Sequence, residues 1–255
     1  MPEIYSLASQ KGGVGKTSCT LALATGLAQK GKRVLLIDVD PQANSSKVLL
    51  ADYMADIKPN DTLYNTIIKR GPLPLHKTQY ENLTIVPSHI FLSNTDLELA
   101  NALDNRAARL KNQLDQIKDN YDYIFLDCPP SLGLLTINAF TASDYVLVVT
   151  SYGYFELDST IQISRVINQV KEEYKLNTKL TIKGFIFNLA DHTANSRETL
   201  ALLKDRYQGF VFETQIPRNI AVKNSAFNKT DIYSYDKASP AAIAFTRLMQ
   251  EIFNV

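Results

Sequence analysis

The chain has 255 residues, of which 45% are hydrophobic and 21% are charged, so it is long enough for a substantial core and has the composition of an ordinary globular protein. Its formal net charge of +1 gives no overall argument for a nucleic-acid partner, and its two cysteines, Cys19 and Cys128, exclude a disulfide framework and a CxxC motif. No apolar run reaches transmembrane length, the N-terminus lacks the pattern of a signal peptide, and a reducing cytoplasm is the expected location.

Strand-like and helix-like patterns alternate along most of the chain. The near-continuous apolar runs that predict buried parallel strands are Ile4–Ser9, Val34–Val39, Leu83–Pro87, Tyr123–Asp127, Tyr145–Ser151, Ile182–Asn188 and Val211–Ile216. The predicted helices cover residues 17–30, 94–119, 157–175, 195–207 and 239–253. Residues 51–82 break the pattern, because prolines and a glycine leave room only for a short helix near Thr62–Lys69. The alternation predicts one α/β domain over residues 1–255, with a doubly wound, mostly parallel sheet flanked by helices.

The first predicted strand runs into a glycine-rich loop and then a helix. The loop reads Lys11-Gly12-Gly13-Val14-Gly15-Lys16-Thr17, followed by Ser18, and it fits the P-loop pattern except that Gln10 replaces the first glycine. In such a loop, backbone N–H groups and the positive end of the helix dipole surround phosphate oxygens. Lys16 is therefore expected to reach the β- and γ-phosphates and the Thr17 hydroxyl to meet Mg²⁺. A chance glycine-rich turn would not need two lysines and a threonine at these positions.

The next predicted strand ends in two carboxylates, Asp38 and Asp40, before Pro41 directs the chain out of the sheet. Ligands of doubly wound sheets bind at the carboxyl ends of the strands, so both aspartates are expected beside the phosphate loop. The alternative is that they only cap the following turn. Residues 123–127 form another apolar strand that ends in an aspartate, Asp127, and two prolines follow it. This is the form of a Walker B element, whose carboxylate holds the metal or its water shell.

Three of these motifs together resemble the ParA/Soj group of partition ATPases, in the deviant Walker A superfamily. They are Lys-Gly-Gly-Val-Gly-Lys-Thr-Ser at residues 11–18, Asp-Val-Asp-Pro-Gln-Ala-Asn at 38–44 and Phe-Leu-Asp-Cys-Pro-Pro-Ser at 125–131. Residues 216–219 and 235–255 extend the likeness over nearly the whole chain, and a start just before the first strand is similar to the short form without an N-terminal helix-turn-helix domain.

The resemblance implies a function in the segregation of plasmid or chromosomal DNA. It implies an ATPase that uses ATP and Mg²⁺, forms a homodimer around ATP and binds DNA without sequence preference. A ParB-like centromere-binding protein would stimulate hydrolysis and thereby release the DNA. The expected location is the cytoplasm, in association with the nucleoid.

The resemblance also implies residue roles at the matched positions. Lys11 would cross to the ATP of the other subunit, Gly12 would lie at the tight interface, and Asp40 would position the attacking water. The implied catalytic residues are Lys11, Lys16 and Asp40, and the implied metal site is Thr17, Asp38 and Asp127. The implied nucleotide contacts are Lys11, Gly12, Gly13, Val14, Gly15, Lys16, Thr17, Ser18, Asn188 and Pro217. Asn188 has an alternative role as a turn-forming residue at a strand end.

DNA binding in the resembling proteins uses basic side chains on the C-terminal side of the dimer, which neutralise phosphates in a salt-sensitive manner. Between Arg218 and Lys229 all charged side chains are basic. The candidate DNA-binding residues are Arg197, Arg218, Lys223, Lys229 and Arg247. The alternative for each is a solvated helix face.

Other functions within the same superfamily are the alternatives to a partition ATPase. A membrane-surface ATPase resembling MinD needs a basic amphipathic C-terminal helix, but residues 241–255 contain Arg247 as their one cation, so a helix packed in the core and no membrane partner are expected. The cysteines do not fit an iron–sulfur carrier. A nucleotide-gated scaffold with negligible hydrolysis stays open, because the catalytic groups are present but rates cannot be inferred from a sequence.

Overall fold

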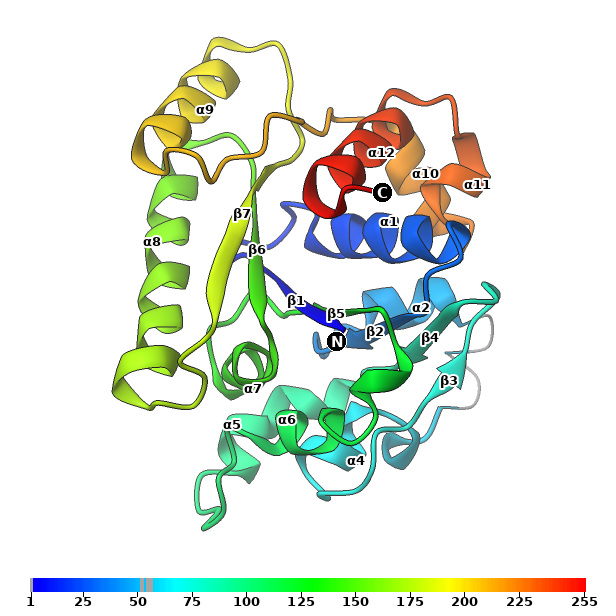
Figure 1. The fold of residues 1–255 in the computed structure, drawn as a ribbon, viewed down its shortest axis with the longest axis vertical. Coiled ribbons are helices and arrows are strands. Elements are labelled where there is room, and N and C mark those ends of the chain that lie inside the picture. The colour runs from blue at the N-terminus through cyan, green and yellow to red at the C-terminus, as the bar shows by residue number, and fades with distance from the viewer. Residues whose placement is uncertain (1, 51–52, 54–56) are drawn as a thin grey trace.

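Seven strands form one sheet in the order β3-β4-β2-β5-β1-β6-β7 in the computed structural model, which describes residues 2–50, 53 and 57–255, without the side chains of residues 154–157 (Figure 1). The strands are β1 (Glu3–Ala8), β2 (Val34–Asp38), β3 (His76–Lys77), β4 (Leu83–Val86), β5 (Tyr123–Asp127), β6 (Tyr145–Thr150) and β7 (Thr181–Phe187). Every neighbouring pair is parallel except β3 with β4. The expected doubly wound, mostly parallel sheet is therefore confirmed; part of residues 51–82 lies outside the described residues.

Helices cover both faces of the sheet (Figure 1). One face carries α1 (Lys16–Gln29), α2 (Asn44–Leu49), α10 (Ile220–Phe227), α11 (Ile232–Asp236) and α12 (Pro240–Phe253). The other carries α4 (Leu63–Ile67), α5 (Thr95–Glu98), α6 (Arg109–Leu114), α7 (Leu134–Ala142), α8 (Tyr154–Asn168) and α9 (Ala194–Arg206). Short helical turns are η1 (Pro59–Asp61), η2 (Ile90–Asn94), η3 (Lys118–Asn120) and η4 (Gln169–Glu173), the last a π-helical extension of α8.

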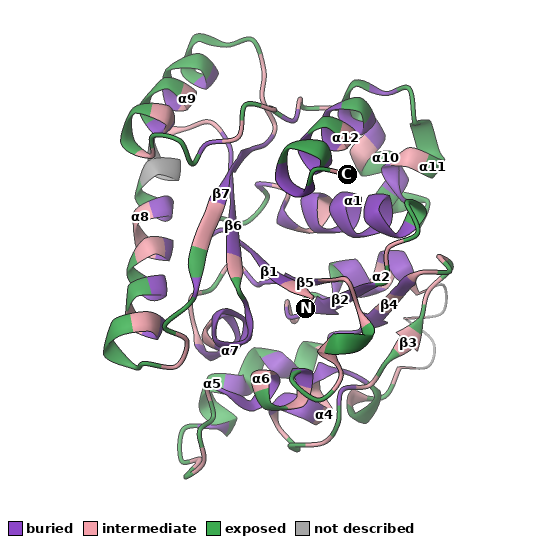
Figure 2. Cartoon of the chain, viewed as in Figure 1, coloured by how far each residue is buried: buried purple, intermediate pink, exposed green. Residues whose placement is uncertain are grey.

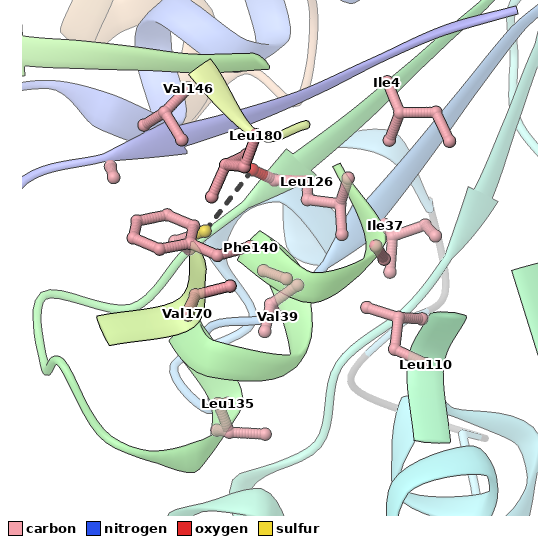
Figure 3. Close-up of a cluster of buried hydrophobic side chains, with 14 of the residues drawn as sticks. Ile4, Ile37, Val39, Leu110, Leu126, Leu135, Phe140, Val146, Val170 and Leu180 are labelled. Carbon is pink, nitrogen blue, oxygen red and sulfur yellow. Dashed lines mark hydrogen bonds between the residues drawn. The ribbon is translucent and has the colours of Figure 1, made fainter. Parts of the chain in front are cut away.

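Alternate side chains of each strand enter two separate cores. In β1, Ile4 and Ala8 point to the α7 side, whereas Tyr5 and Leu7 point to the α1 side. Figure 3 shows the first core, in which Phe140 of α7 lies among side chains from the strands. Burial on both faces explains why these strands appear as apolar runs rather than as alternating patterns. Figure 2 shows that α1 is also buried over most of its surface, because α12 covers it.

The C-terminal helix α12 packs in the core, as expected from its sequence. Phe245, Leu248 and Ile252 are buried in the same cluster as α1. Across the described parts of the chain, no helix combines the length and apolar character that a membrane crossing requires.

Two predicted elements are wrong in detail. The helix predicted over 94–119 is divided into α5 and α6, because Arg106 donates hydrogen bonds to the carbonyl groups of Leu99 and Ala100 at 2.6 and 2.9 Å and so caps the end of α5. The strand predicted at Val211–Ile216 is reduced to one isolated bridge from Val211 to β7, and a second bridge, between Ala190 and Pro217, lies just beyond it.

The interruption of that strand has a local cause. The backbone N–H groups of Glu213 and Thr214 donate to the carboxylate of Glu251 in α12, at 2.7 and 3.1 Å, and are therefore not available to a sheet. Pro217 has no N–H group to continue the pairing.

Candidate functional site

Four chain segments meet at the carboxyl edge of the sheet. The glycine-rich loop joins β1 to α1, Asp38 ends β2, Asp127 ends β5, and Asn188 follows β7. Asp38 and Asp127 stand opposite each other in the register of the paired strands β2 and β5. The expectation that the aspartates and the loop share one edge is therefore confirmed in position.

The glycine-rich loop has a backbone shape that requires glycine at two places. Gly13 and Gly15 have φ angles of 81° and 88°, in the left-handed region that side chains disfavour. Gly15 also precedes the first residue of α1, and no side chain caps this helix end. The N–H groups of the first turn therefore face the loop, where an anion can accept their hydrogen bonds.

Lys16 lies under this loop with only 7% of its surface exposed. Its Nζ donates a hydrogen bond to the carbonyl oxygen of Lys11 at 3.4 Å. Burial lowers the pKa of Lys16, while the charges of Asp127 and Asp40 act in the opposite direction. The buried ammonium group of Lys16 lies between the glycine loop and two carboxylates. A negatively charged ligand in the loop would neutralise the positive charge of this group.

Asp127 is buried and receives hydrogen bonds from several hydroxyl groups. Its Oδ2 accepts from Ser45 Oγ at 2.7 Å, and its Oδ1 accepts from Thr20 Oγ1 at 3.3 Å. Burial raises the pKa of Asp127, and hydrogen bonds from Ser45 and Thr17 oppose this rise. The Thr17 hydroxyl and the Asp127 carboxylate are thus neighbours, as a shared metal site requires.

Asp38 is fully buried behind Asp127. Its Oδ2 accepts from both the backbone N–H and the hydroxyl of Ser46, at 2.9 and 2.7 Å, and its Oδ1 accepts from the N–H of Asp40 at 3.3 Å. Burial and the negative charge of Asp127 raise the pKa of Asp38 well above its ordinary value. A bound cation would stabilise two buried carboxylates that lie on adjacent strands.

Mg²⁺ fits this set of donors only with ligands from outside the protein. In the residues that the structure describes, no three His, Cys, Asp or Glu side chains are grouped to hold a metal ion. Mg²⁺ commonly keeps several waters and takes one or two carboxylates together with substrate phosphates. Thr17 and Asp127, with Asp38 behind them, match that pattern.

Asp40 is half-buried at the start of the turn before α2. Its Oδ1 accepts from the N–H of Gln42 at 2.9 Å, and its carbonyl oxygen accepts from the N–H of Ala43 at 2.8 Å. Asp40 therefore caps this turn. Its role in positioning water stays a prediction, which the proximity of Asp40 to Lys16 allows.

Asn188 braces the glycine-rich loop. Its Nδ2 donates to the carbonyl oxygen of Val14 at 2.7 Å, and the side chain is buried so close to Gly15 that a Cβ atom there would collide with it. Pro217 forms a bridge with Ala190, which is two residues after Asn188 in the chain. Contacts of Asn188 and Pro217 with adenine stay predictions.

The candidate DNA-binding residues fall into two groups. Arg247 lines a hollow of about 510 Å³. Arg197 and Arg218 are at its margin, because they are hydrogen-bonded to the lining residues His192 and Ala190. The second group, Lys223 and Lys229, is exposed on α10 and just after it.

Two of the arginines already have partners within the chain. Arg218 donates to the Tyr152 hydroxyl at 2.8 Å and its guanidinium carbon lies 5.7 Å from the centre of that ring. Arg197 donates to the carbonyl oxygen of His192 at 2.8 Å.

Comparisons with known proteins agree with this geometry. A family model described as an AAA domain matches residues 2–182. The sporulation initiation inhibitor protein Soj of Bacillus subtilis is 37% identical over 255 residues, which cover 99% of this chain and 98% of Soj. This chain belongs to the ParA/Soj family of P-loop ATPases. Chromosome partitioning protein ParA of Caulobacter vibrioides is 34% identical, over 98% of this chain and 94% of that protein.

A solved structure shows the fold that the ParA/Soj chain shares with its wider superfamily. The septum site-determining protein MinD of Pyrococcus horikoshii, complexed with Mg-ADP, matches with a TM-score of 0.81 at 26% identity, over 99% of this chain and 96% of MinD.

The structure adds residues to this ParA/Soj site that the sequence did not indicate. Ser45 and Ser46 hold the two buried carboxylates, and Tyr152 holds Arg218. The serines directly follow the Asp-Val-Asp-Pro-Gln-Ala-Asn segment at residues 38–44, which was their one available signal.

Proposed function

We propose that this protein is an ATP-dependent DNA partition ATPase, acting as a homodimer joined by ATP and Mg²⁺. The ATP-bound dimer binds DNA without sequence preference, and a ParB-like centromere-binding protein stimulates hydrolysis and release. The name of its relative ParA, a chromosome partitioning protein, supports the assignment to partition, and Mg-ADP in the MinD structure supports the cofactors. The proposal takes residues 1–255 as one P-loop ATPase domain located in the cytoplasm, in association with the nucleoid.

In this proposal the chain's own residues bind and orient the triphosphate. The loop N–H groups and Lys16 hold the β- and γ-phosphates, and Asp40 orients the attacking water. Thr17 and Asp127, supported by Asp38, hold Mg²⁺, which supplies neutralisation of the phosphate charge. Phosphoryl transfer depends mainly on such positioning and charge stabilisation.

The proposal of a dimer rests on the surroundings of Gly12. A Cβ atom at Gly12 would meet nothing within 4 Å, so packing within one protomer does not require a glycine there. Lys11, Gly12 and Gly13 are all exposed at the loop. A second copy in close contact would account for both the glycine and the lysine, which would then reach the ATP of the other subunit.

DNA binding is assigned to the basic residues on the C-terminal side: Arg197, Arg218 and Arg247 around the hollow, and Lys223 and Lys229 near α10. Their separation into two groups suits contact with an extended polyphosphate backbone. We do not propose a membrane partner, because the apolar face of α12 is buried against α1.

The test compares Lys11→Ala with Lys30→Ala, which removes another exposed lysine at the far end of α1. Molar mass is measured by light scattering in the presence of ATP and Mg²⁺. We expect wild type and Lys30→Ala to form dimers and Lys11→Ala to remain monomeric. A Lys11→Ala dimer of normal stability would refute the role in trans. Hydrolysis that stays at background with DNA and the centromere-binding protein would favour the nucleotide-gated scaffold.

A further inference from the structure

The short helix α2 connects the metal-binding edge of the site to the turn that carries Asp40. It begins directly after that turn, and its second and third residues, Ser45 and Ser46, are both fully buried. Each serine is bonded to a carboxylate on a different strand: Ser45 to Asp127 on β5 and Ser46 to Asp38 on β2.

We infer that Ser45 is a positioning residue for the Mg²⁺–nucleotide site: it fixes the Asp127 carboxylate and thereby couples metal binding to the Asp40 turn. This inference rests on the proposed function. It adds to that function a residue that acts through its hydrogen bond to Asp127.

The first argument is the number of protons available to Asp127. Thr20 Oγ1 lies 3.0 Å from the carbonyl oxygen of Lys16 and 3.3 Å from Asp127 Oδ1, and one hydroxyl proton cannot serve both acceptors at once. Ser45 Oγ donates only to Asp127 Oδ2, at 2.7 Å. Thr17 also donates to Asp127, but its hydroxyl is itself an expected Mg²⁺ ligand. The Ser45 bond is shorter than the Thr20 bond and undivided, so it is the bond that holds the carboxylate when Thr17 turns to the metal.

The second argument is the anchoring of α2 through Ser46. The Ser46 hydroxyl donates to Asp38 and accepts from the N–H of Ser88 at 3.0 Å, and the Ser46 backbone N–H binds the same Asp38 oxygen. Ser46 therefore fastens α2 to the ends of β2 and β4. With α2 held in this way, Ser45 is the residue of the pair that contacts Asp127, the carboxylate that neighbours Thr17.

The third argument is the short path from Ser45 to Asp40. The turn is closed by the Asp40 carboxylate on Gln42 and by the Asp40 carbonyl oxygen on Ala43, whose φ of 56° is a left-handed conformation. α2 starts at the next residue. A displacement of Asp127 on metal binding is thus passed through Ser45 to the turn with little flexible chain between them.

The experiment measures metal dependence separately from nucleotide binding. A fluorescent, non-hydrolysable ATP analogue is titrated with Mg²⁺ at fixed nucleotide, and its affinity is measured again in EDTA. For Ser45→Ala we expect the Mg²⁺ concentration at half-maximal binding to rise about 10-fold, a typical effect of losing a group that orients a metal ligand. The affinity in EDTA should stay at the wild-type value, and Ser45→Thr should restore most of the metal response.

The matched control is Thr25→Val, which removes a buried hydroxyl from α1 that donates to the carbonyl oxygen of Leu21. This variant should leave the Mg²⁺ midpoint unchanged, and thermal unfolding shows whether each variant folds. An unchanged midpoint in folded Ser45→Ala overturns the inference, and so does an equal loss of affinity in EDTA and in Mg²⁺, which would indicate a merely structural role. Wild-type protein that binds no analogue in either buffer would instead refute the proposed function.

Discussion

Asp40 has one observed role and one proposed role, and a single substitution can separate them. Its carboxylate caps the turn before α2 through the N–H of Gln42, and in the proposed mechanism the same carboxylate positions water. An asparagine can accept the same backbone hydrogen bond but has no negative charge.

We predict that Asp40→Asn keeps the fold and ATP binding but lowers hydrolysis about 100-fold, because the charge that orients the attacking water is lost. Phosphate release is measured with DNA and the centromere-binding protein present. Asp40→Ala should lose the turn cap as well and unfold at a lower temperature. Wild-type turnover in Asp40→Asn would leave only the turn-capping role.

The residues that could be predicted at this scale are those whose chemistry follows from spacing along the chain. Lys16, Thr17 and Asp127 were found in this way, because a glycine loop and a strand end impose their positions. Ser45 was not found, because its hydrogen bond to Asp127 joins residues 82 positions apart, and serine after a turn is common. A polar contact of this kind depends on the packing of two strands and cannot be read from one segment.

The connection between β6 and α8 is linked to the segment after Pro217 by the Arg218–Tyr152 pair. The hydroxyl of Tyr152 accepts from Arg218 at 2.8 Å, and the Arg218 charge also acts on Asp191, whose pKa is lowered chiefly by hydrogen bonds from Thr193 and further by Arg218. Arg218 is exposed, yet its guanidinium is engaged by a neighbouring element. A phosphate of DNA would have to compete with this contact.

We therefore predict that Tyr152→Phe strengthens DNA binding about 2- to 5-fold, since the ring is retained while a surface hydrogen bond worth roughly 0.5–1 kcal/mol is removed. Fluorescence anisotropy with a labelled duplex at several salt concentrations measures the change. Arg218→Ala in the same background should abolish the gain. Weaker binding by Tyr152→Phe would mean that the tyrosine presents Arg218 to DNA rather than withholding it.

Elements with a clear period were predictable, and others were not. The long helices α1, α8, α9 and α12 follow the expected positions, although α1 is buried on most sides and was predictable mainly because it follows the glycine-rich loop. By contrast, α7 was missed, because its nine residues are buried on almost every side and give no helical period. α10 and α2 are too short for a reliable pattern. The strand predicted at 211–216 was broken by Glu251, a residue far along the chain that takes two of its N–H groups.

At the scale of the whole molecule, the surface around Gly12 is expected to decide between monomer and dimer. We predict that Gly12→Val leaves the unfolding temperature and ATP binding near wild type, because a Cβ atom at Gly12 would meet nothing within 4 Å in the protomer. The same side chain should prevent close contact of two copies, so light scattering in ATP and Mg²⁺ should report a monomer. Dimers of ordinary stability would show that the interface lies elsewhere.

Both edges of the sheet offer few free backbone groups for pairing. β3 contributes only two residues on one side, and on the other side Phe185 of β7 exchanges backbone hydrogen bonds with Phe210 and Phe212, so in the described part of the chain neither margin offers a long row of open amide groups. Strand-to-strand adhesion between neighbouring molecules is thereby discouraged. If many copies gather on one DNA molecule, as the proposed function requires, these short sheet edges would limit aggregation at high local concentration and leave assembly to reversible contacts.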